Sequence, residues 1–323
     1  MKLPRRKFLH LAAGVAALPA VSRIARADTY PTRPVHLIVG FPAGAGQDIF
    51  ARLMGRWLSD QLGQQFVIEN RPGAGSNIAA EMVVRAPPDG YTLLQVSATN
   101  AINATLYDKL NFDFVRDIAS VASIARVPFV MVVNPSVPAK TVPEFISYAK
   151  ANPGKINMAS PGNGSANHVF GELFKAMAGV DMVHVPYRSN PRPDLLGGQV
   201  QVMFDGVNTS LEFIRTGKLR ALAVTTATRL AVLPDIPTVG EFVPGYEASG
   251  WQGMIAPKNT PAEIIDKLNK EINAGLADPT MKSRLADLGS TVLALSPADF
   301  GKLIAADTEK WAKVIREGNI KAE

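Results

Sequence analysis

Short apolar runs alternate with amphipathic stretches along most of this chain, a pattern that favours an α/β architecture. Residues 35–40 form an apolar run that predicts a strand, and the apolar spacing over residues 49–62 predicts a helix ending at Gly63. Residues 66–70 predict a second strand, and a helix is expected near residues 77–85.

The alternation continues to the C-terminus. We expect further strands at residues 91–97, 129–134, 156–160, 182–185, 200–204 and 219–225. We expect further helices at residues 142–155, 168–179, 261–276, 280–288 and 297–316. The last three begin at or beside a proline or a short hydroxyl residue, as helix starts often do.

The first 27 residues have the layout of an export signal. A basic start is followed by an apolar stretch over residues 8–21 and by Ala25, Arg26 and Ala27, so cleavage is expected before Asp28. The motif over residues 5–9 fits the twin-arginine variant. A membrane anchor is the alternative, but the apolar stretch is shorter than the roughly 20 residues that span a bilayer, and Pro19 interrupts it.

Charge and cysteine content exclude several classes of function. Six of the 34 basic residues lie in residues 1–27, so 28 basic residues face 28 acidic ones in the mature chain. Such a balance argues against nucleic acid as a partner. The chain has no cysteine, which excludes disulfides, thiolate metal sites and cysteine nucleophiles. After Asp28 no apolar run is long enough for a membrane span, so we expect a soluble product of two domains.

Two glycine-rich turns join a predicted strand to a predicted helix. The first loop (residues 41–48) reads FPAGAGQD, and the second loop (residues 160–168) reads SPGNGSANH. Each places backbone N–H groups at a helix start, where an anion can bind. Asp48 can cap the first helix, and Ser165 or Asn167 the second. Facing each other across a cleft, the two loops could hold a carboxylate.

The first loop also permits a nucleotide. Gly44 and Gly46 begin a G-x-G-x-x-G pattern, and Glu69 follows about 20 residues later. Ile49 occupies the third glycine position, however, and obstructs the close helix packing of a dinucleotide site. A purely structural turn is the third possibility.

Catalytic and metal sites are not expected. Ser160 or Ser165 with His168 could suggest a nucleophile, but no G-x-S-x-G elbow surrounds them. His36, His168 and His184 lack metal-ligand spacing. We predict no catalytic residue, no metal and no cofactor.

Several longer stretches resemble the Bug family, the substrate-binding receptors of tripartite tricarboxylate transporters. The stretches include PVHLIVGFPAGAGQDIFARL, NPGKINMASPGNGSANHVFGELFKAMAGVDMVHVPYR and GKLRALAVTTATRLAVLPDIPTVGE, and the resemblance covers residues 29–320. It implies a periplasmic binding protein of type II, with two α/β lobes and a ligand cleft between them. Lobe 1 would hold residues 28–127 plus 246–323, and lobe 2 residues 128–245.

The resemblance also implies the binding residues. In such receptors the two loops hold a carboxylate, largely through backbone N–H groups and ordered water, while the segments matching residues 97–103, 187–189 and 205–208 line the remaining cleft. Phe41 and Tyr187 would supply apolar walls. The expected ligand-binding residues are Phe41, Ala43, Gly44, Ala45, Gly46, Asp48, Ser97, Asn100, Ser160, Gly162, Asn163, Gly164, Ser165, His168, Tyr187, Arg188 and Asp205.

The chain departs from the family pattern in three places. Ala45 separates two glycines that are usually adjacent, and Asn100 and Ala104 stand where the family usually has histidine and proline. The loop over residues 189–193 is shorter and contains two prolines, so Arg188 or Arg192 could pair with a distal carboxylate.

We therefore expect a periplasmic, monomeric receptor without catalytic activity that delivers a small organic carboxylate to a membrane permease. Two alternatives stay open at this point: an exported nucleotide-dependent oxidoreductase, and a ligand-sensing partner of a membrane signalling protein.

Overall fold

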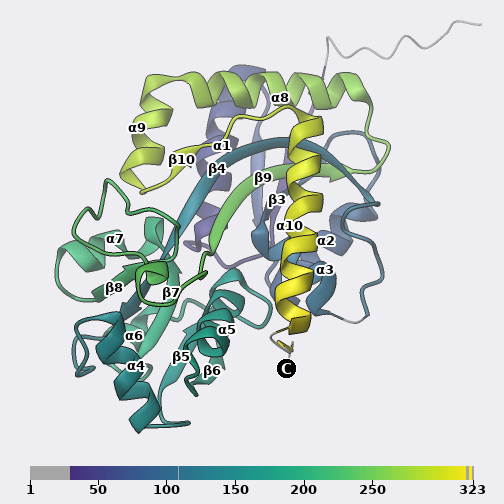
Figure 1. The fold of residues 1–323 in the computed structure, drawn as a ribbon. Coiled ribbons are helices and arrows are strands. Elements are labelled where there is room, and N and C mark those ends of the chain that lie inside the picture. Colours follow the sequence, from purple (N-terminus) through teal and green to yellow (C-terminus); the bar gives the residue numbers. More distant parts are fainter. Residues whose placement is uncertain (1–29, 108, 318–319, 322–323) are drawn as a thin grey trace, which may run out of the picture. The chain divides into compact units, whose positions relative to one another are not determined.

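The predicted alternation of strands and helices is present in the computed structural model, which describes residues 30–107, 109–317 and 320–321 (Figure 1). The predicted export signal lies outside these residues. The strands are β1 (Val35–Val39), β2 (Phe66–Asn70), β3 (Thr92–Ser97), β4 (Ile118–Val133), β5 (Asn157–Ser160), β6 (Val183–Pro186), β7 (Val202–Gly206), β8 (Arg220–Val224), β9 (Ser249–Pro257) and β10 (Thr291–Val292). The helices are α1 (Gly46–Leu62), α2 (Asn77–Val84), α3 (Ala98–Leu106), α4 (Val142–Ala151), α5 (Ala166–Ala178), α6 (Arg192–Gly197), α7 (Val207–Arg215), α8 (Ala262–Ala277), α9 (Pro279–Asp287) and α10 (Pro297–Glu317), with short 3₁₀ turns at Ala74–Ser76 and Val239–Glu241.

The strands hydrogen-bond in the order β2-β1-β3-β9-β4-β7-β5-β6, and β8 and β10 also pair with β4. β1 is parallel to β2 and β3, and β5 is parallel to β6 and β7. The turns β1–α1 and β3–α3 therefore lie at one edge of their strands, and so do the turns β5–α5 and β7–α7. The carboxyl ends of parallel strands are where α/β proteins bind their ligands.

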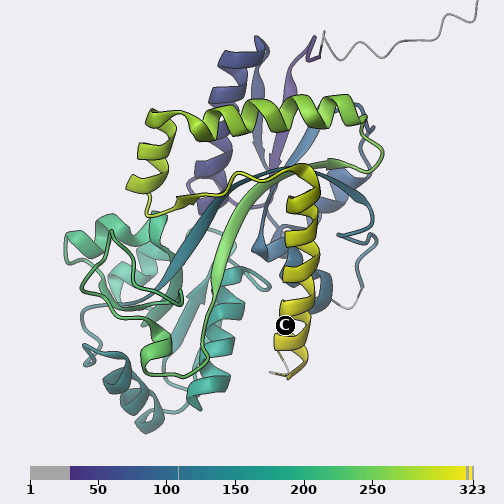
Figure 2. The ribbon, with the colours of Figure 1, turned by 45° about the horizontal axis from the view of Figure 1, so that its top comes forward.

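β4 divides the sheet into two regions. Its residues up to Pro128 pair with β9, its residues from Phe129 onward pair with β7, and those from Val130 onward pair also with β8. We call β2, β1, β3, β9, β10 and the first part of β4 the first sheet region, and the second part of β4 with β8, β7, β5 and β6 the second sheet region. β4 and β9 run side by side in both views (Figures 1 and 2). The division into lobes at residues 127 and 245 stays a prediction.

Each sheet region has its own apolar core. Ile38 and Phe300 belong to a buried cluster under the first sheet region, and Met203 and Leu211 belong to a separate cluster under the second. α10 packs against α3 and thereby covers the first region with the C-terminal part of the chain. Each sheet region therefore packs against an apolar core of its own.

The structure contains elements that the sequence did not predict, among them β9, α3, α6 and α7, and it differs from the prediction at two further places. α1 begins at Gly46 instead of Ile49, and its N-cap residue Ala45 has no side-chain cap, so Asp48 does not cap the helix. β4 is far longer than the strand predicted at residues 129–134, because it continues through Pro128. The predicted Ser165 cap is present, since its side chain accepts a hydrogen bond from the His168 N–H. None of the helices in the described residues combines the length and apolar character needed to cross a membrane.

Candidate binding cavity

Five helix starts meet around one small cavity. Its volume is about 80 Å³, and it receives residues from the starts of α1, α3, α5, α6 and α7 and from β9. The lining consists of residues 41–43, 45–47, 97–99, 127, 129, 161, 166–167, 189–192, 203, 205–206, 208–209 and 250–252. Both sheet regions contribute, so the cavity lies where the first loop and the second loop approach each other.

The first loop is held from inside by a buried carboxylate. The Asp48 side chain accepts hydrogen bonds from the Gly44 N–H and from Arg52 Nε, both at 2.8 Å, and from Asn70 Nδ2 at 2.9 Å. Asn70 Nδ2 also donates to the Phe41 carbonyl oxygen at 2.9 Å. Burial raises the pKa of Asp48, but the hydrogen bonds from Arg52, Gly44 and Asn70 outweigh it, and its pKa lies below the ordinary value. Asp48 therefore shapes the loop and does not face the cavity.

Unused hydrogen-bonding groups gather at the start of α1. The backbone N–H groups of Gly46 and Gln47 have no partner among the described residues, as first-turn amides of a helix commonly lack one. Gln47 is buried; its Nε2 donates to Ser97 Oγ at 2.7 Å, while its Oε1 is unpartnered. Nδ2 of Asn208, at the start of α7, is also buried and unpartnered. A Cβ added to Gly46 would lie 3.4 Å from that nitrogen, so these groups adjoin.

The second loop is more self-contained. The Gly162 N–H donates to Ser160 Oγ at 3.2 Å, and the Gly164 N–H donates to His168 Nδ1 at 3.2 Å. The Ala166 N–H reaches across to α3, where Thr99 Oγ1 accepts it at 3.1 Å. Fewer amides of this loop are thus available to a ligand than the glycine content of the loop suggests.

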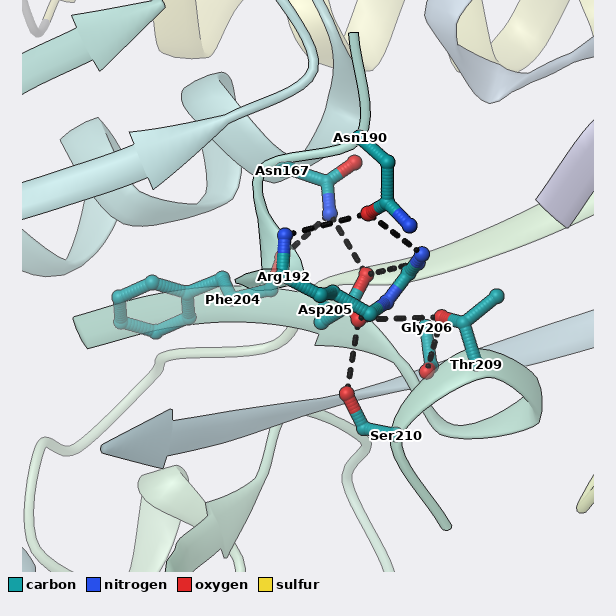
Figure 3. A network of polar contacts seen from close by, with 8 residues as sticks. All are labelled: Asn167, Asn190, Arg192, Phe204, Asp205, Gly206, Thr209 and Ser210. Atoms are coloured by element: carbon teal, nitrogen blue, oxygen red, sulfur yellow. Dashed lines mark hydrogen bonds and ion pairs between the residues drawn. The ribbon is translucent and has the colours of Figure 1, made fainter. Parts of the chain in front are cut away.

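A buried ion pair forms another part of the wall (Figure 3). Arg192 donates from Nε to Asp205 Oδ2 at 2.7 Å and from Nη2 to Asp205 Oδ1 at 3.2 Å. Asn190 Oδ1 accepts from Arg192 Nη1 at 3.1 Å. Thr209 Oγ1, Ser210 Oγ and Asn167 Nδ2 also donate to the Asp205 carboxylate, at 3.1, 2.7 and 3.2 Å. The distal cation considered from the sequence, Arg192, is therefore already paired.

Apolar side chains complete the wall. Val127 and Phe129 come from β4, Met203 from β7 and Trp251 from β9, and all four are buried. Phe41 of the first loop also lines the cavity. The cavity thus combines a few polar groups with an apolar surface, the usual composition of a small-molecule site.

A second cavity, of about 630 Å³, adjoins the first. Phe41, Pro42 and Pro161 line both cavities. The second is lined by residues 40–42, 72–76, 107, 161–163 and 186–188. Arg188 is exposed there, and the Tyr187 hydroxyl donates to Asp194 Oδ2 at 2.7 Å. Burial and the neighbouring Asp194 carboxylate raise the pKa of Tyr187 to about 12.

The expected binding residues fall into three groups. Those lining the first cavity are Phe41, Ala43, Ala45, Gly46, Ser97 and Asp205. Those lining the second cavity are Gly162, Asn163, Tyr187 and Arg188, together with Phe41 again. Gly44, Asp48, Asn100, Ser160, Gly164, Ser165 and His168 line neither cavity. Members of this last group position the lining: Asn100, for example, forms the capping box of α3 with Ser97.

Two histidines stack behind the second loop. The His168 and His184 ring centroids are 3.8 Å apart, and His184 Nε2 lies 2.7 Å from Ser160 Oγ. Ser160 Oγ donates to the Gly162 carbonyl oxygen at 3.0 Å, so it accepts from His184. Because Ser160 is fully buried and its proton points into the loop, this serine–histidine contact supports the turn and presents no nucleophile to either cavity.

The nucleotide alternative finds little support. Glu69, which would bind a ribose in a dinucleotide site, is paired with His36 and Arg71. These two side chains thus occupy its carboxylate, and the hydrogen bonds from His36 and Arg71 hold the pKa of Glu69 below its ordinary value. Within the described residues no group of three or more His, Asp or Glu side chains is arranged to hold a metal ion.

Gln47, Asn167, Asn190 and Thr209 also reach the cavity, although the sequence did not single them out as ligand contacts. Gln47 stands between Gly46 and Asp48 in the first loop and has no motif of its own. Its position directly after the glycine turn, on the first turn of α1, is the signal that could have identified it.

Comparison with known proteins assigns the family. Residues 50–320 match the model of the tripartite tricarboxylate transporter family receptor. Protein BugT of Bordetella pertussis is 37% identical over 300 residues, which cover 91% of this chain and 92% of BugT.

Solved structures agree. R. palustris Rpa4515, determined with adipate, is 37% identical with a TM-score of 0.87 and covers 90% of this chain and 99% of its own. The periplasmic binding protein BugD is 34% identical with a TM-score of 0.87, covering 91% and 100%. MatC from Rhodopseudomonas palustris, with bound malate, is 31% identical with a TM-score of 0.85, covering 88% and 100%. These matches confirm the predicted α/β periplasmic-binding-protein fold, and the chain belongs to the tripartite tricarboxylate transporter receptor family, the Bug proteins.

Proposed function

We propose that this chain is a periplasmic receptor that binds a small organic carboxylate in the first cavity and delivers it to a tripartite tricarboxylate-type permease. The observation that carries the proposal is the set of unused donors where α1 and α7 begin: the Gly46 and Gln47 amides of α1 and the adjoining Asn208 Nδ2 of α7. Such donors bind a carboxylate by charge-assisted hydrogen bonds without a dedicated cation.

The family and its solved members support the choice of ligand. Rpa4515 and MatC were determined with the dicarboxylates adipate and malate, and both share the fold of this chain closely. The cavity draws its wall from both sheet regions, so a ligand in it would contact both and favour the closed arrangement of two predicted lobes. The protein itself would catalyse no reaction.

Binding is tested by a thermal-shift screen of the mature chain against small acids, followed by calorimetric titration of the acids that raise the melting temperature. A ligand present at 100 times its Kd should stabilise the protein by about 2.7 kcal/mol. A panel in which no carboxylate binds, or in which a dinucleotide binds instead, would contradict the proposal.

Delivery to a permease is tested separately, by uptake of the radiolabelled acid in cells that carry or lack the gene. Loss of uptake on deletion, restored by the intact chain, is the expected result. Unchanged uptake with loss of a transcriptional response to the same acid would favour a sensing role.

A further inference from the structure

The charge of the first cavity is balanced within its own wall. Among the described residues that line it, Arg192 and Asp205 are the ones with ionisable side chains of acidic or basic type, and they form an ion pair at 2.7 Å. Their side chains are only 11% and 3% exposed. A buried pair of this kind brings no net charge to the cavity.

Asp205 has no capacity left for a ligand. Its Oδ1 accepts from Arg192 Nη2 and Asn167 Nδ2, and its Oδ2 accepts from Arg192 Nε and two hydroxyls. Donors of the protein therefore occupy both oxygens of this carboxylate, and Arg192 is its charged partner.

Arg192 retains two of its five guanidinium N–H groups after its contacts to Asp205 and Asn190. A second carboxylate on the ligand could reach these N–H groups only by losing its water inside the cavity. The attraction of Arg192 would then be opposed by Asp205, which lies against the same guanidinium. The exposed Arg188 of the second cavity offers little instead, because water and salt screen it.

The rest of the wall favours hydrocarbon. Val127, Phe129, Met203 and Trp251 leave an apolar surface beside the donors at the start of α1. We propose that the first cavity selects acids with one carboxylate and an apolar remainder over the dicarboxylates of the same chain length, because Asp205 cancels the charge of Arg192 that would otherwise attract a second carboxylate. This inference rests on the proposed function and names its ligand class.

The test compares acids that differ only by a methyl group replaced with a carboxylate: butyrate with succinate, and hexanoate with adipate. Calorimetric titration of the mature chain at pH 7.5 should give at least tenfold lower Kd for the monocarboxylate of the pair that binds. A dicarboxylate that binds as tightly as its partner, or more tightly, would overturn the inference and leave the proposed function standing. No binding by any acid of a wider panel would overturn the proposed function itself.

Two variants assign the selectivity to the ion pair. Asp205→Asn leaves Arg192 unbalanced, so the preference should shift at least tenfold toward the dicarboxylate. The double variant Arg192→Gln with Asp205→Asn restores zero net charge and should keep the preference of the parent. Melting temperatures establish that each variant is folded, and the comparison of acids on the unaltered chain decides the inference if Asp205→Asn does not fold. A folded Asp205→Asn variant with unchanged preference would show that Asp205 does not set the selectivity.

Discussion

The Asp48 carboxylate accepts a hydrogen bond from the backbone N–H of Gly44, four residues earlier, at 2.8 Å. A buried side chain from the first turn of α1 therefore fixes the turn that precedes the helix. Because Arg52 and Asn70 donate to the same carboxylate, its removal would leave several donors without a partner.

Asp48→Ala should lower the free energy of unfolding by about 2–3 kcal/mol, the cost of leaving such buried groups unpaired. It should also weaken carboxylate binding, because the amides of Gly46 and Gln47 lose their fixed direction. Urea denaturation and calorimetric titration measure the two effects. Asp60→Ala, which removes an exposed carboxylate from the same helix, is the control and should change neither quantity appreciably.

Gly46→Ala probes the cavity wall directly. The added methyl group would lie 3.4 Å from Asn208 Nδ2, and the backbone of Gly46 is not in the left-handed region, so the fold can accept alanine there. We expect about tenfold weaker binding, equivalent to about 1.4 kcal/mol, with an unchanged or higher melting temperature. Gly301→Ala is a matched control, since Gly301 lies in α10 outside both cavities and its added methyl group would lie 3.3 Å from Ser120 Oγ of β4. Equal affinity in the two variants would remove Gly46 from the site.

Trp251 should report ligand binding. It lines the first cavity and its Nε1 donates to Asp307 Oδ2 at 2.8 Å, whereas Trp57 lies outside both cavities. Binding should change the intrinsic tryptophan fluorescence, and Trp251→Phe should abolish most of that change while Trp57→Phe preserves it. The Trp251→Phe variant should also lose about 1–2 kcal/mol of stability, because the half-buried Asp307 carboxylate loses the hydrogen bond from Trp251 Nε1. A full fluorescence response in Trp251→Phe would place the ligand elsewhere.

The sequence was most informative where one element carries its own signal. The strand–turn–helix unit at Ser165 follows from glycine, capping and apolar spacing, and the one at Gly46 follows from glycine and apolar spacing without the predicted Asp48 cap. β4 was predicted only in its second part, because Pro128 normally interrupts a strand; here it stands where β4 exchanges β9 for β7 and β8 as partners.

The site was harder to predict than the fold, for a physical reason. Which of two neighbouring loop residues faces a cavity depends on contacts with distant segments. Asp48 turns inward because Asn70 and Arg52 hold it, and Gln47 is left to face the cavity. The pairing of Arg192 with Asp205 likewise depends on how α6 approaches β7, which no local pattern encodes.

The stacked histidines predict a loss of stability in acid. Burial lowers the pKa of His168 to about 3, helped by His184 and Lys175, and burial together with Lys175 lowers the pKa of His184 to about 4. In an unfolded chain both would titrate near 6.5. Below that pH the unfolded state binds protons that the folded state does not, so the free energy of unfolding should fall as the pH drops from about 6.5 toward 4. Each histidine contributes up to about 1.4 kcal/mol per pH unit in this window.

The test uses variants that keep the hydrogen bonds and cannot titrate. In His168→Asn the amide oxygen can accept from the Gly164 N–H in place of Nδ1, and in His184→Gln the amide nitrogen can donate to Ser160 in place of Nε2. Urea denaturation at pH 7 and pH 5 should show a smaller difference for the double variant than for the parent. Carboxylates with lowered pKa values, such as Asp48 and Glu69, lose their contribution to stability only below about pH 5, outside the interval from pH 7 to pH 5. An undiminished difference between pH 7 and pH 5 in a folded double variant would show that the histidine pair does not cause the acid sensitivity.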